Sequence, residues 1–489
     1  MAKQKASQRK QPVQKYLTTE NAILFLAMLL PLVSVYYDDA NSIIRQGMNV
    51  WEALFSGHFL HYFSLCGESV KQGLMVHQAN YGLVMNLILA VWNLPLWIAE
   101  KIAGGNILEH FAARVWGKSE MLLCAWICVG LLKRIAGKLG FDEKRKQLLG
   151  FLFLSSAWLV LGALLVAQID IICMVFILLA FEALLDENTR KFLIFFTLSV
   201  LTKEFAVFVF LPIILLKEKN LIKAGAMMVL PFAVSFVMNL PFKWADPAGA
   251  LLKKPRTWVM IDQLTRMRIT LFGEIRIPAF FIALAAVVVV SYMTVVPDKK
   301  DLPKWMTYMG LIGMLPVFVC AYSYPYWGVL LLPFVLLLML WERDKLFLKL
   351  FLETAAILAL MVADMVEFPW VFQKVGGMLP DFLFGLQGNA PGIAEQISEF
   401  LKQEKYFNMW TLAYAPFIVW LIDSLVRYYP GRKNATTDTA ENTSSKASAD
   451  NSTNEWIDGT DRSIRILSIL RAIGAFVLCD IEIFLLLFF

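Results

Sequence analysis

Long apolar runs, separated by short polar or charged segments, make up most of this chain. A helix needs about 20 apolar residues to cross the hydrocarbon core of a membrane. Runs near this length, some of them shorter, lie at 21–37, 119–133, 147–166, 169–185, 191–202, 204–216, 222–240, 277–296, 305–320, 325–341, 346–366, 408–426 and 466–489. The pattern predicts an all-α polytopic membrane protein with about thirteen transmembrane helices. The first run lacks a cleavage site and reads as a retained span.

The composition agrees with a membrane protein. Hydrophobic residues make up 58% of the chain and charged residues 17%, whereas soluble proteins average about 45–50% and about 25%. The mean hydropathy is +0.61. Neither a P-loop nor a dinucleotide-binding fingerprint occurs, so a nucleotide-sugar substrate is unsupported, and we expect no nucleic-acid partner.

The basic residues predict the orientation in the membrane. A further apolar segment, 80–99, reads either as a span or as a surface helix. If it is not a span, the basic clusters all fall on one side of the membrane, at 3–15, 133–146, 190–191, 217–223, 299–304, 343–345 and 427–433. Cytoplasmic loops carry the excess of Lys and Arg. We therefore expect a multi-pass plasma-membrane protein with a cytoplasmic N-terminus and with 80–99 at the outer surface.

This topology divides the chain into three parts. Residues 1–430 form one transmembrane domain, with outside loops at 38–118, 242–276 and 367–407. Residues 431–464 are polar and read as a disordered cytoplasmic linker. Residues 465–489 read as a C-terminal transmembrane helix, and we assign no role to its Asp480 and Glu482.

The first outside loop begins with an amphipathic segment. Its apolar residues recur at helical spacing, at Ile44, Met48, Trp51, Phe55 and Phe59. Its polar residues recur at Arg45, Asn49, Glu52 and Ser56, and Gly57 is placed to stop a helix. The spacing predicts a helix that lies along the membrane surface with its apolar face in the lipid, and 80–99 is a second, more immersed element of this kind.

Two adjacent carboxylates, Asp38 and Asp39, stand where the first span meets this helix. Asp and Asn cap helix N-termini, so capping explains either residue taken alone, as it does Asn41. A single cap needs one oxygen acceptor, so two carboxylates exceed what capping requires.

Histidines and cysteines give little support for a metal site. His58, His61, His77 and His110 all lie in the first outside loop, but their spacing matches no zinc pattern. We favour polar surface histidines and assign no metal ligand. The six cysteines show no metal-binding spacing and read as buried, inert thiols.

The second outside loop is basic although positive charge is disfavoured outside. Its basic residues are Lys243, Lys253, Lys254, Arg256, Arg266, Arg268 and Arg276, against Asp246, Asp262 and Glu274. They read either as side chains that snorkel to lipid headgroups or as a phosphate site, and we favour the phosphate site. Lys203 and Glu204 lie between two short spans and read either as a hairpin tip or, for Lys203, as a further phosphate ligand.

Several motifs together resemble the GT-C class of membrane glycosyltransferases. They are the carboxylates after the first span, "AQIDIICMVFILLA" (167–180), "LTKEFAVFVFLPIILL" (201–216) and "SYPYWGVLLLPF" (323–334). The chain looks most like bacterial relatives of the mannosyltransferases of GPI-anchor synthesis, over most of residues 20–430.

The resemblance implies roles for named residues. Enzymes of this class use an acidic residue of the first outside loop as the catalytic base, here Asp38 or Asp39. Their Gly-Gln-x-Asp motif falls on Gln168 and Asp170, with Ala167 in place of Gly. The other motif positions are Lys203, Glu204, Tyr324 and Tyr326. The implied ligands of the donor phosphate are Lys203, Lys253, Lys254, Arg256, Arg266 and Arg268.

The implied reaction is transfer of a sugar, mannose in the nearest relatives, from a polyprenyl-phosphate donor. The acceptor is a glycan, lipid or protein outside the cytoplasm, and it stays open because "HQANYG" (77–82) replaces the family's Tyr-Pro-Pro-rich segment. No cofactor is required, although paired carboxylates near His58 and His61 leave room for a divalent metal. The alternatives are a lipid-linked oligosaccharide polymerase or ligase, a transporter or flippase, and a structural subunit. Residues 367–407 contain neither Arg nor His, which counts against the polymerase or ligase.

Overall fold

The computed structural model describes residues 19–252, 255–321, 323–341, 345–367, 375–377, 382, 398–403, 409–431, 463–464 and 466–475. Within these ranges the chain is helical apart from two small two-stranded ribbons. The all-α prediction is confirmed to that extent. Most of the predicted linker 431–464, most of the loop 367–407, and Asp480 and Glu482 lie outside the described residues.

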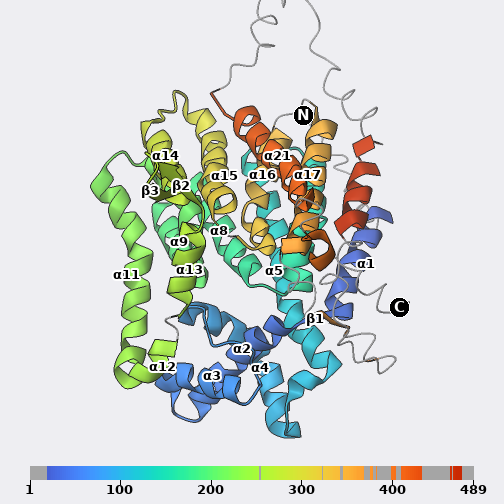
Figure 1. Cartoon of the computed structure of the whole chain (residues 1–489), viewed down its shortest axis with the longest axis vertical. Helices are drawn as coiled ribbons and strands as arrows, with labels where there is room; N and C mark the ends of the chain where they lie inside the picture. Colours follow the sequence, from blue (N-terminus) through green and yellow to red (C-terminus); the bar gives the residue numbers. More distant parts are fainter. Residues whose placement is uncertain are drawn as a thin grey trace, which may run out of the picture.

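Most helices pack side by side as a bundle (Figure 1). The helices of its first half are α1 (Thr19–Ser34), α5 (Phe111–Lys138), α6 (Glu143–Leu154), α7 (Ala157–Leu159), α8 (Asp170–Leu185), α9 (Thr189–Thr202), α10 (Ala206–Lys217) and α11 (Leu221–Ala245). Those of its second half are α14 (Ala279–Met293), α15 (Leu302–Cys320), α16 (Leu332–Trp341), α17 (Leu346–Glu367), α21 (Tyr414–Arg427) and a last helix at Ile466–Ala475.

A second group of helices lies at one end of the bundle (Figure 1). This end layer consists of α2 (Asp38–Phe55), α3 (Tyr62–Lys71), α4 (Leu83–Ala103) and α12 (Pro247–Leu252). The second loop adds α13 (Pro255–Thr265) and the hairpin of β2 (Arg268–Leu271) and β3 (Ile275–Pro278). The strand β1 (Val35–Tyr37) pairs with β4 (Val375–Gly377). Short helical turns are η1 (Phe59–His61), η2 (Ile107–Glu109), η4 (Lys299–Asp301), η5 (Pro325–Leu330) and η7 (Met409–Ala413).

Five helices among the described residues are long and apolar enough to cross a membrane. They are Leu83–Ala103, Phe111–Lys138, Leu221–Ala245, Lys299–Cys320 and Leu346–Ala363. A sixth arises if the pair Glu143–Leu154 and Ala157–Leu165, bent by 48°, counts as one span. Other apolar helices are shorter. The count of about thirteen spans, and the orientation, therefore stay predictions.

The amphipathic helix predicted after Asp39 is present as α2, but its surroundings differ from the prediction. Ile44 and Met48 are only 2% and 1% exposed, because they pack against Leu96 and Leu108 of this same chain. The prediction that the apolar face of α2 lies in lipid is therefore wrong for Ile44 and Met48, whereas Phe55 near the end of the helix is 68% exposed. The physical reason is that α4 covers the side chains of Ile44 and Met48. Packing the two apolar helix surfaces against each other removes both from water, which is favourable.

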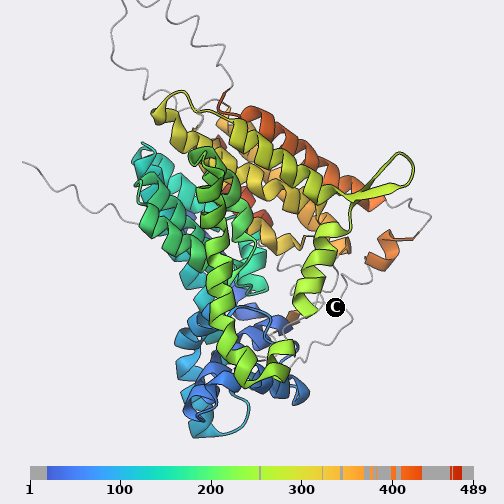
Figure 2. The ribbon, with the colours of Figure 1, turned by 90° about the vertical axis from the view of Figure 1, so that its left-hand side faces the viewer.

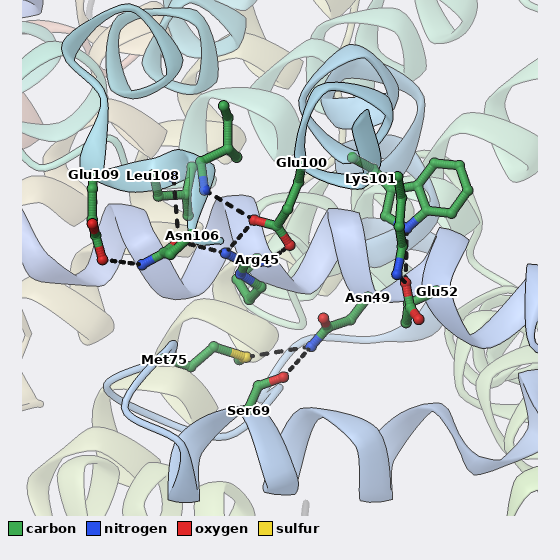
Figure 3. A network of polar contacts seen from close by, with 12 residues as sticks. Arg45, Asn49, Glu52, Ser69, Met75, Glu100, Lys101, Asn106, Leu108 and Glu109 are labelled. Atoms are coloured by element: carbon green, nitrogen blue, oxygen red, sulfur yellow. Dashed lines mark hydrogen bonds and ion pairs between the residues drawn. The ribbon is translucent and has the colours of Figure 1, made fainter. Parts of the chain in front are cut away.

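The polar face of α2 is also buried, in a network that joins α2 to α3 and α4 (Figure 3). The Arg45 guanidinium donates to both carboxylate oxygens of Glu100, at 2.5 and 2.9 Å, and to Asn106 Oδ1 at 2.7 Å. The Asn49 amide donates to Ser69 Oγ at 2.9 Å. The two parallel hydrogen bonds to Glu100 offset the cost of burying the Arg45 charge.

One turn further along α2, Glu52 is held by α4. It accepts hydrogen bonds from Trp97 Nε1 at 3.0 Å and from Lys101 Nζ at 2.6 Å. Burial alone would raise the pKa of Glu52, but these two hydrogen bonds outweigh it and leave that pKa lowered. Contacts with other helices thus hold both faces of α2, and they fix the position of its first turn.

Gly47 allows α2 and α4 to lie close together. A Cβ at this position would meet the carbonyl oxygen of Leu89 at 2.6 Å. We expect Gly47→Ala to lower the free energy of unfolding by about 1–3 kcal/mol, as overpacking does elsewhere. Thermal unfolding of the detergent-purified protein, followed by tryptophan fluorescence, measures the change.

Gly130→Ala is the matched control, because a Cβ there meets no described atom within 4 Å. Its midpoint should equal that of the wild type or lie slightly above it, since Ala favours a helix over Gly by about 1 kcal/mol. Equal midpoints for the two variants would contradict the close α2–α4 packing.

Candidate active site

Asp39 lies in the first turn of α2, at the junction of the bundle and the end layer. The N-cap position is Tyr37, whose side chain makes no capping hydrogen bond. The capping interpretation of Asp39 and Asn41 is therefore wrong. The side chain of Asp38 lies outside the described residues. A carboxylate in a first helical turn is favoured by the helix dipole, and Asp39 keeps 22% of its side chain exposed.

Both carboxylate oxygens of Asp39 have a partner from a distant segment. Gln168 Nε2 donates to Asp39 Oδ2 at 3.4 Å. His77 Nε2 lies 3.5 Å from Asp39 Oδ1. The two contacts hold the carboxylate from two sides while leaving it reachable from solvent.

Gln168 is positioned by an irregular segment of the bundle. The π-helical turn Val160–Leu165 ends shortly before Gln168. The backbone N–H of Gln168 donates to the Gly162 carbonyl at 2.8 Å. Its side chain is 3% exposed, and Tyr81 Oη donates to Gln168 Oε1 at 3.4 Å. Tyr81 thus holds the amide oxygen of Gln168, which leaves the amide nitrogen directed at Asp39.

Ala167 has a left-handed backbone, with φ of 54°. Non-glycine residues pay about 1–2 kcal/mol for this conformation. Glycine would adopt this conformation without that cost. This turn comes directly before Gln168, whose amide contacts Asp39.

His77 is a residue that the sequence analysis missed as a functional candidate. The backbone N–H groups of Val76 and His77 donate to Ser42 Oγ at 2.9 and 3.4 Å. His77 Nδ1 lies 3.0 Å from the Gln78 carbonyl. Oxygen acceptors thus face both ring nitrogens, and an imidazole donates to both only when each nitrogen carries a proton.

The loop that carries His77 and Tyr81 is fixed at two further points. Gln78 Nε2 donates to the Phe63 carbonyl at 2.6 Å. A Cβ at Gly82 would lie 2.6 Å from the Leu201 carbonyl, so the loop packs against the end of α9. The available signal in the sequence was the segment "HQANYG" itself, which supplies both side chains.

Lys203 and Asp170 form an ion pair inside the bundle. Their side chains are 3% and 1% exposed, and Lys203 Nζ lies 5.0 Å from the ring centroid of Trp327. The prediction that Lys203 binds the donor phosphate directly is not supported by this placement, because its charge is already neutralised by a buried carboxylate. Glu204 is partly buried in the turn that follows α9.

Aromatic side chains form one wall beside Asp39. Tyr324 stacks on Tyr326, with ring centroids 5.5 Å apart and planes 18° apart. Burial raises the pKa of Tyr324, and the charge of Asp39 adds to this, while Arg266 and a hydrogen bond with Gln263 act in the opposite direction. Asp39, Arg266 and Gln263 are therefore all close enough to Tyr324 to act on it.

The remaining basic residues of the second loop are less closely tied to Asp39. Arg266 forms an exposed ion pair with Asp262 at 2.7 Å. Arg268 is exposed at the base of the β2–β3 hairpin. Lys253, Lys254 and the side chain of Arg256 lie outside the described residues. Of the predicted phosphate ligands, Arg266 is the one whose charge acts on the site through Tyr324.

The described residues contain no group of three or more His, Cys, Asp or Glu side chains that could hold a metal ion. The ring centroids of His58 and His61 are 6.1 Å apart. The cysteines Cys66, Cys124, Cys128, Cys173 and Cys320 are free and buried, which confirms the prediction for the described part of the chain.

Comparisons with known proteins do not assign the chain to a family. No family model matches it, and no curated protein matches it. The cryo-EM structure of the arabinosyltransferase EmbB from Mycobacterium smegmatis is similar, with a TM-score of 0.34 and 12% sequence identity. The match covers 98% of this chain and 42% of that chain, so the chain spans less than half of that protein. A likeness this low carries neither fold nor activity over to this chain.

The left-handed backbone at Ala167 can be tested with two substitutions. Gly accepts this conformation freely, whereas a β-branched residue is a strong outlier there. We expect Ala167→Gly to keep the thermal midpoint of the wild type and Ala167→Val to lose about 1–3 kcal/mol. A Val variant as stable as the wild type would show that the turn before Gln168 is not left-handed.

The buried ion pair predicts a non-additive pair of substitutions. Lys203→Met leaves Asp170 buried without its charge partner and should lose about 3–5 kcal/mol of stability. Adding Asp170→Leu removes the unpaired charge and should recover most of that loss. Chemical unfolding of the wild type, Lys203→Met and the double variant in detergent measures the three free energies of unfolding. A double variant no more stable than Lys203→Met would contradict the pairing.

Proposed function

We propose that this protein is a membrane glycosyltransferase. It transfers a sugar from a polyprenyl-phosphate donor to an acceptor hydroxyl on the extracytoplasmic side. The observation that carries the proposal is the Asp39 carboxylate, which is held by Gln168 and His77 at the end of a bundle of apolar helices. A lipid-borne donor and a water-soluble or membrane-borne acceptor can meet at such a junction.

The reaction is an inverting displacement at the anomeric carbon of the sugar. The acceptor oxygen forms the new bond while the bond from the anomeric carbon to the phosphate oxygen breaks, and the polyprenyl phosphate leaves with the electron pair. The acceptor proton passes to Asp39. A positioned general base of this kind raises the reaction rate about 10²–10⁴-fold. To act in this way, Asp39 needs an exposed carboxylate oxygen and a fixed orientation.

The neighbouring side chains take supporting roles. Gln168 and His77 orient Asp39, and the Asp170–Lys203 pair holds the segment that carries Gln168. We assign Arg266 to stabilise the leaving phosphate, where negative charge develops, because its charge acts on Tyr324 near Asp39. The stacked pair Tyr324 and Tyr326 offers an apolar wall for a sugar ring. Mannose is the proposed sugar, on the family resemblance alone.

The Asp39 role predicts a large loss of rate without loss of structure. In lipid nanodiscs with radiolabelled polyprenyl-phosphate mannose, Asp39→Asn should lower transfer about 10²–10⁴-fold while donor binding persists. Glu68→Gln is the control, because Glu68 is an exposed carboxylate of α3 that pairs with Lys71 in the same helix. It should keep the wild-type rate.

Two outcomes would decide against this assignment. If Asp38→Asn abolishes transfer and Asp39→Asn does not, the base is the neighbouring carboxylate. If neither substitution changes the release of sugar from the carrier, the protein is no glycosyltransferase of this kind. Movement of intact donor across the bilayer by all variants would then favour the flippase.

A further inference from the structure

The β2–β3 hairpin is an isolated two-stranded ribbon that projects away from the helices (Figure 2). Its register pairs Arg268 with Pro278, Ile269 with Ile277, Thr270 with Arg276, and Leu271 with Ile275. The Ala279 N–H donates to the Met267 carbonyl at 2.9 Å, which extends the ladder to the first residue of α14. The ribbon is therefore tied directly to that helix.

This register gives the ribbon two unlike faces. Residues directly opposite each other across a strand pair lie on the same face, and the faces alternate along each strand. One face carries four aliphatic side chains, namely those of Ile269, Leu271, Ile275 and Ile277. The other face carries Arg268, Thr270, Arg276 and Pro278.

The apolar face is left open by the rest of the described chain. Ile269 and Leu271 are 40% and 38% exposed, and Ile275 is 55% exposed. Phe272 stands at the tip, 93% exposed. A two-stranded ribbon is marginal in water on its own, and an exposed apolar patch of this kind marks a contact with a membrane or a partner.

The helix that follows identifies a membrane as the contact. α14 begins at the end of β3 and is apolar from Ala279 to Val290. The side chains of its open face are Phe281, Ile282, Val289, Val290 and Met293, each 40% exposed or more. In a chain with five described helices able to cross a membrane, such a face lies against lipid. The hairpin therefore leaves the bundle where α14 meets the membrane surface.

The charges of the opposite face complement that surface. Arg268 and Arg276 are both exposed. Guanidinium groups pair with lipid phosphates, and basic side chains near the ends of membrane helices extend toward the headgroups. An aromatic residue such as Phe272 is suited to the boundary between headgroups and acyl chains.

We propose that the β2–β3 hairpin is a membrane anchor that inserts Phe272 and the aliphatic face into the leaflet beside α14. Arg268 and Arg276 bind lipid phosphates of that leaflet. This assignment moves Arg268 from the donor site to the bilayer and does not depend on the proposed reaction. By holding the end of α13, the anchor fixes Gln263 and Arg266 beside Tyr324.

Site-specific fluorescence in nanodiscs tests the insertion. Phe272→Cys is labelled with an environment-sensitive fluorophore in the full-length protein, and the five described cysteines are buried and should stay unlabelled. Spin-labelled lipids should quench the label at position 272 by about twofold or more, since surface elements enter a bilayer by about 5–10 Å. The same label on Lys71→Cys, whose native side chain is 73% exposed in α3, should not be quenched.

A second pair of variants separates lipid from other occupants. Removing the guanidinium groups with Arg268→Gln and Arg276→Gln should reduce quenching at position 272 in anionic nanodiscs. Equal, weak quenching at positions 272 and 71 would overturn the proposal. So would a label at position 272 that is shielded from soluble iodide but not quenched by spin-labelled lipid, because a protein surface would then cover the hairpin.

Discussion

The ion pair between Asp170 and Lys203 is the interaction on which the arrangement of the site depends. Two charges buried among apolar helices are costly unless they remain together, so the start of α8 and the end of α9 cannot move independently. Gln168 lies two residues before Asp170 and thereby gains a fixed position. The loop with Tyr81 packs against the same end of α9 through Gly82. The residues around Asp39 thus share one rigid support.

The end layer supplies the other half of the site. Its helix α2 is held on its apolar face by α4 and on its polar face by the Arg45–Glu100 pair. Because both faces are fixed, the first turn of α2 presents Asp39 in a constant orientation toward the bundle. The left-handed residue Ala167 lets Gln168 meet it there. Strain stored at a site in this way persists only where the surroundings over-determine the conformation.

Part of this arrangement could be predicted from the sequence. Apolar runs indicate the helices, and the spacing from Ile44 to Phe59 predicts α2, because both are local patterns. Asp39, Gln168, Tyr324 and Lys203 are found as motif residues, and the structure gathers them in one region. The partners of these residues could not be predicted from local sequence patterns, because they lie far away along the chain. Arg45 meets Glu100 across 55 residues, and Gln168 meets Asp39 across 129.

The same limit applies where the structure departs from what the sequence suggests. Lys203 reads as an open phosphate ligand until its contact with Asp170 is known. The face of α2 reads as lipid-facing until α4 is seen to cover it. Apart from its place in the segment "HQANYG", His77 gave no signal, because its pairing with Asp39 depends on a loop fixed by Ser42 and Gln78. The two-faced hairpin was also missed, although the alternation in "RITLFGEIRI" (268–277) is typical of paired strands.

The most direct measurement of the central claim is a cryo-EM structure of the Asp39→Asn protein in lipid nanodiscs with a polyprenyl-phosphate sugar. The substitution removes the base but keeps the shape of the side chain, so donor should accumulate. Our account predicts the anomeric carbon of the sugar beside position 39, with the phosphate directed toward Arg266. A sugar bound away from position 39, or a lipid in the site without its sugar, would contradict the assignment of Asp39 as the catalytic base.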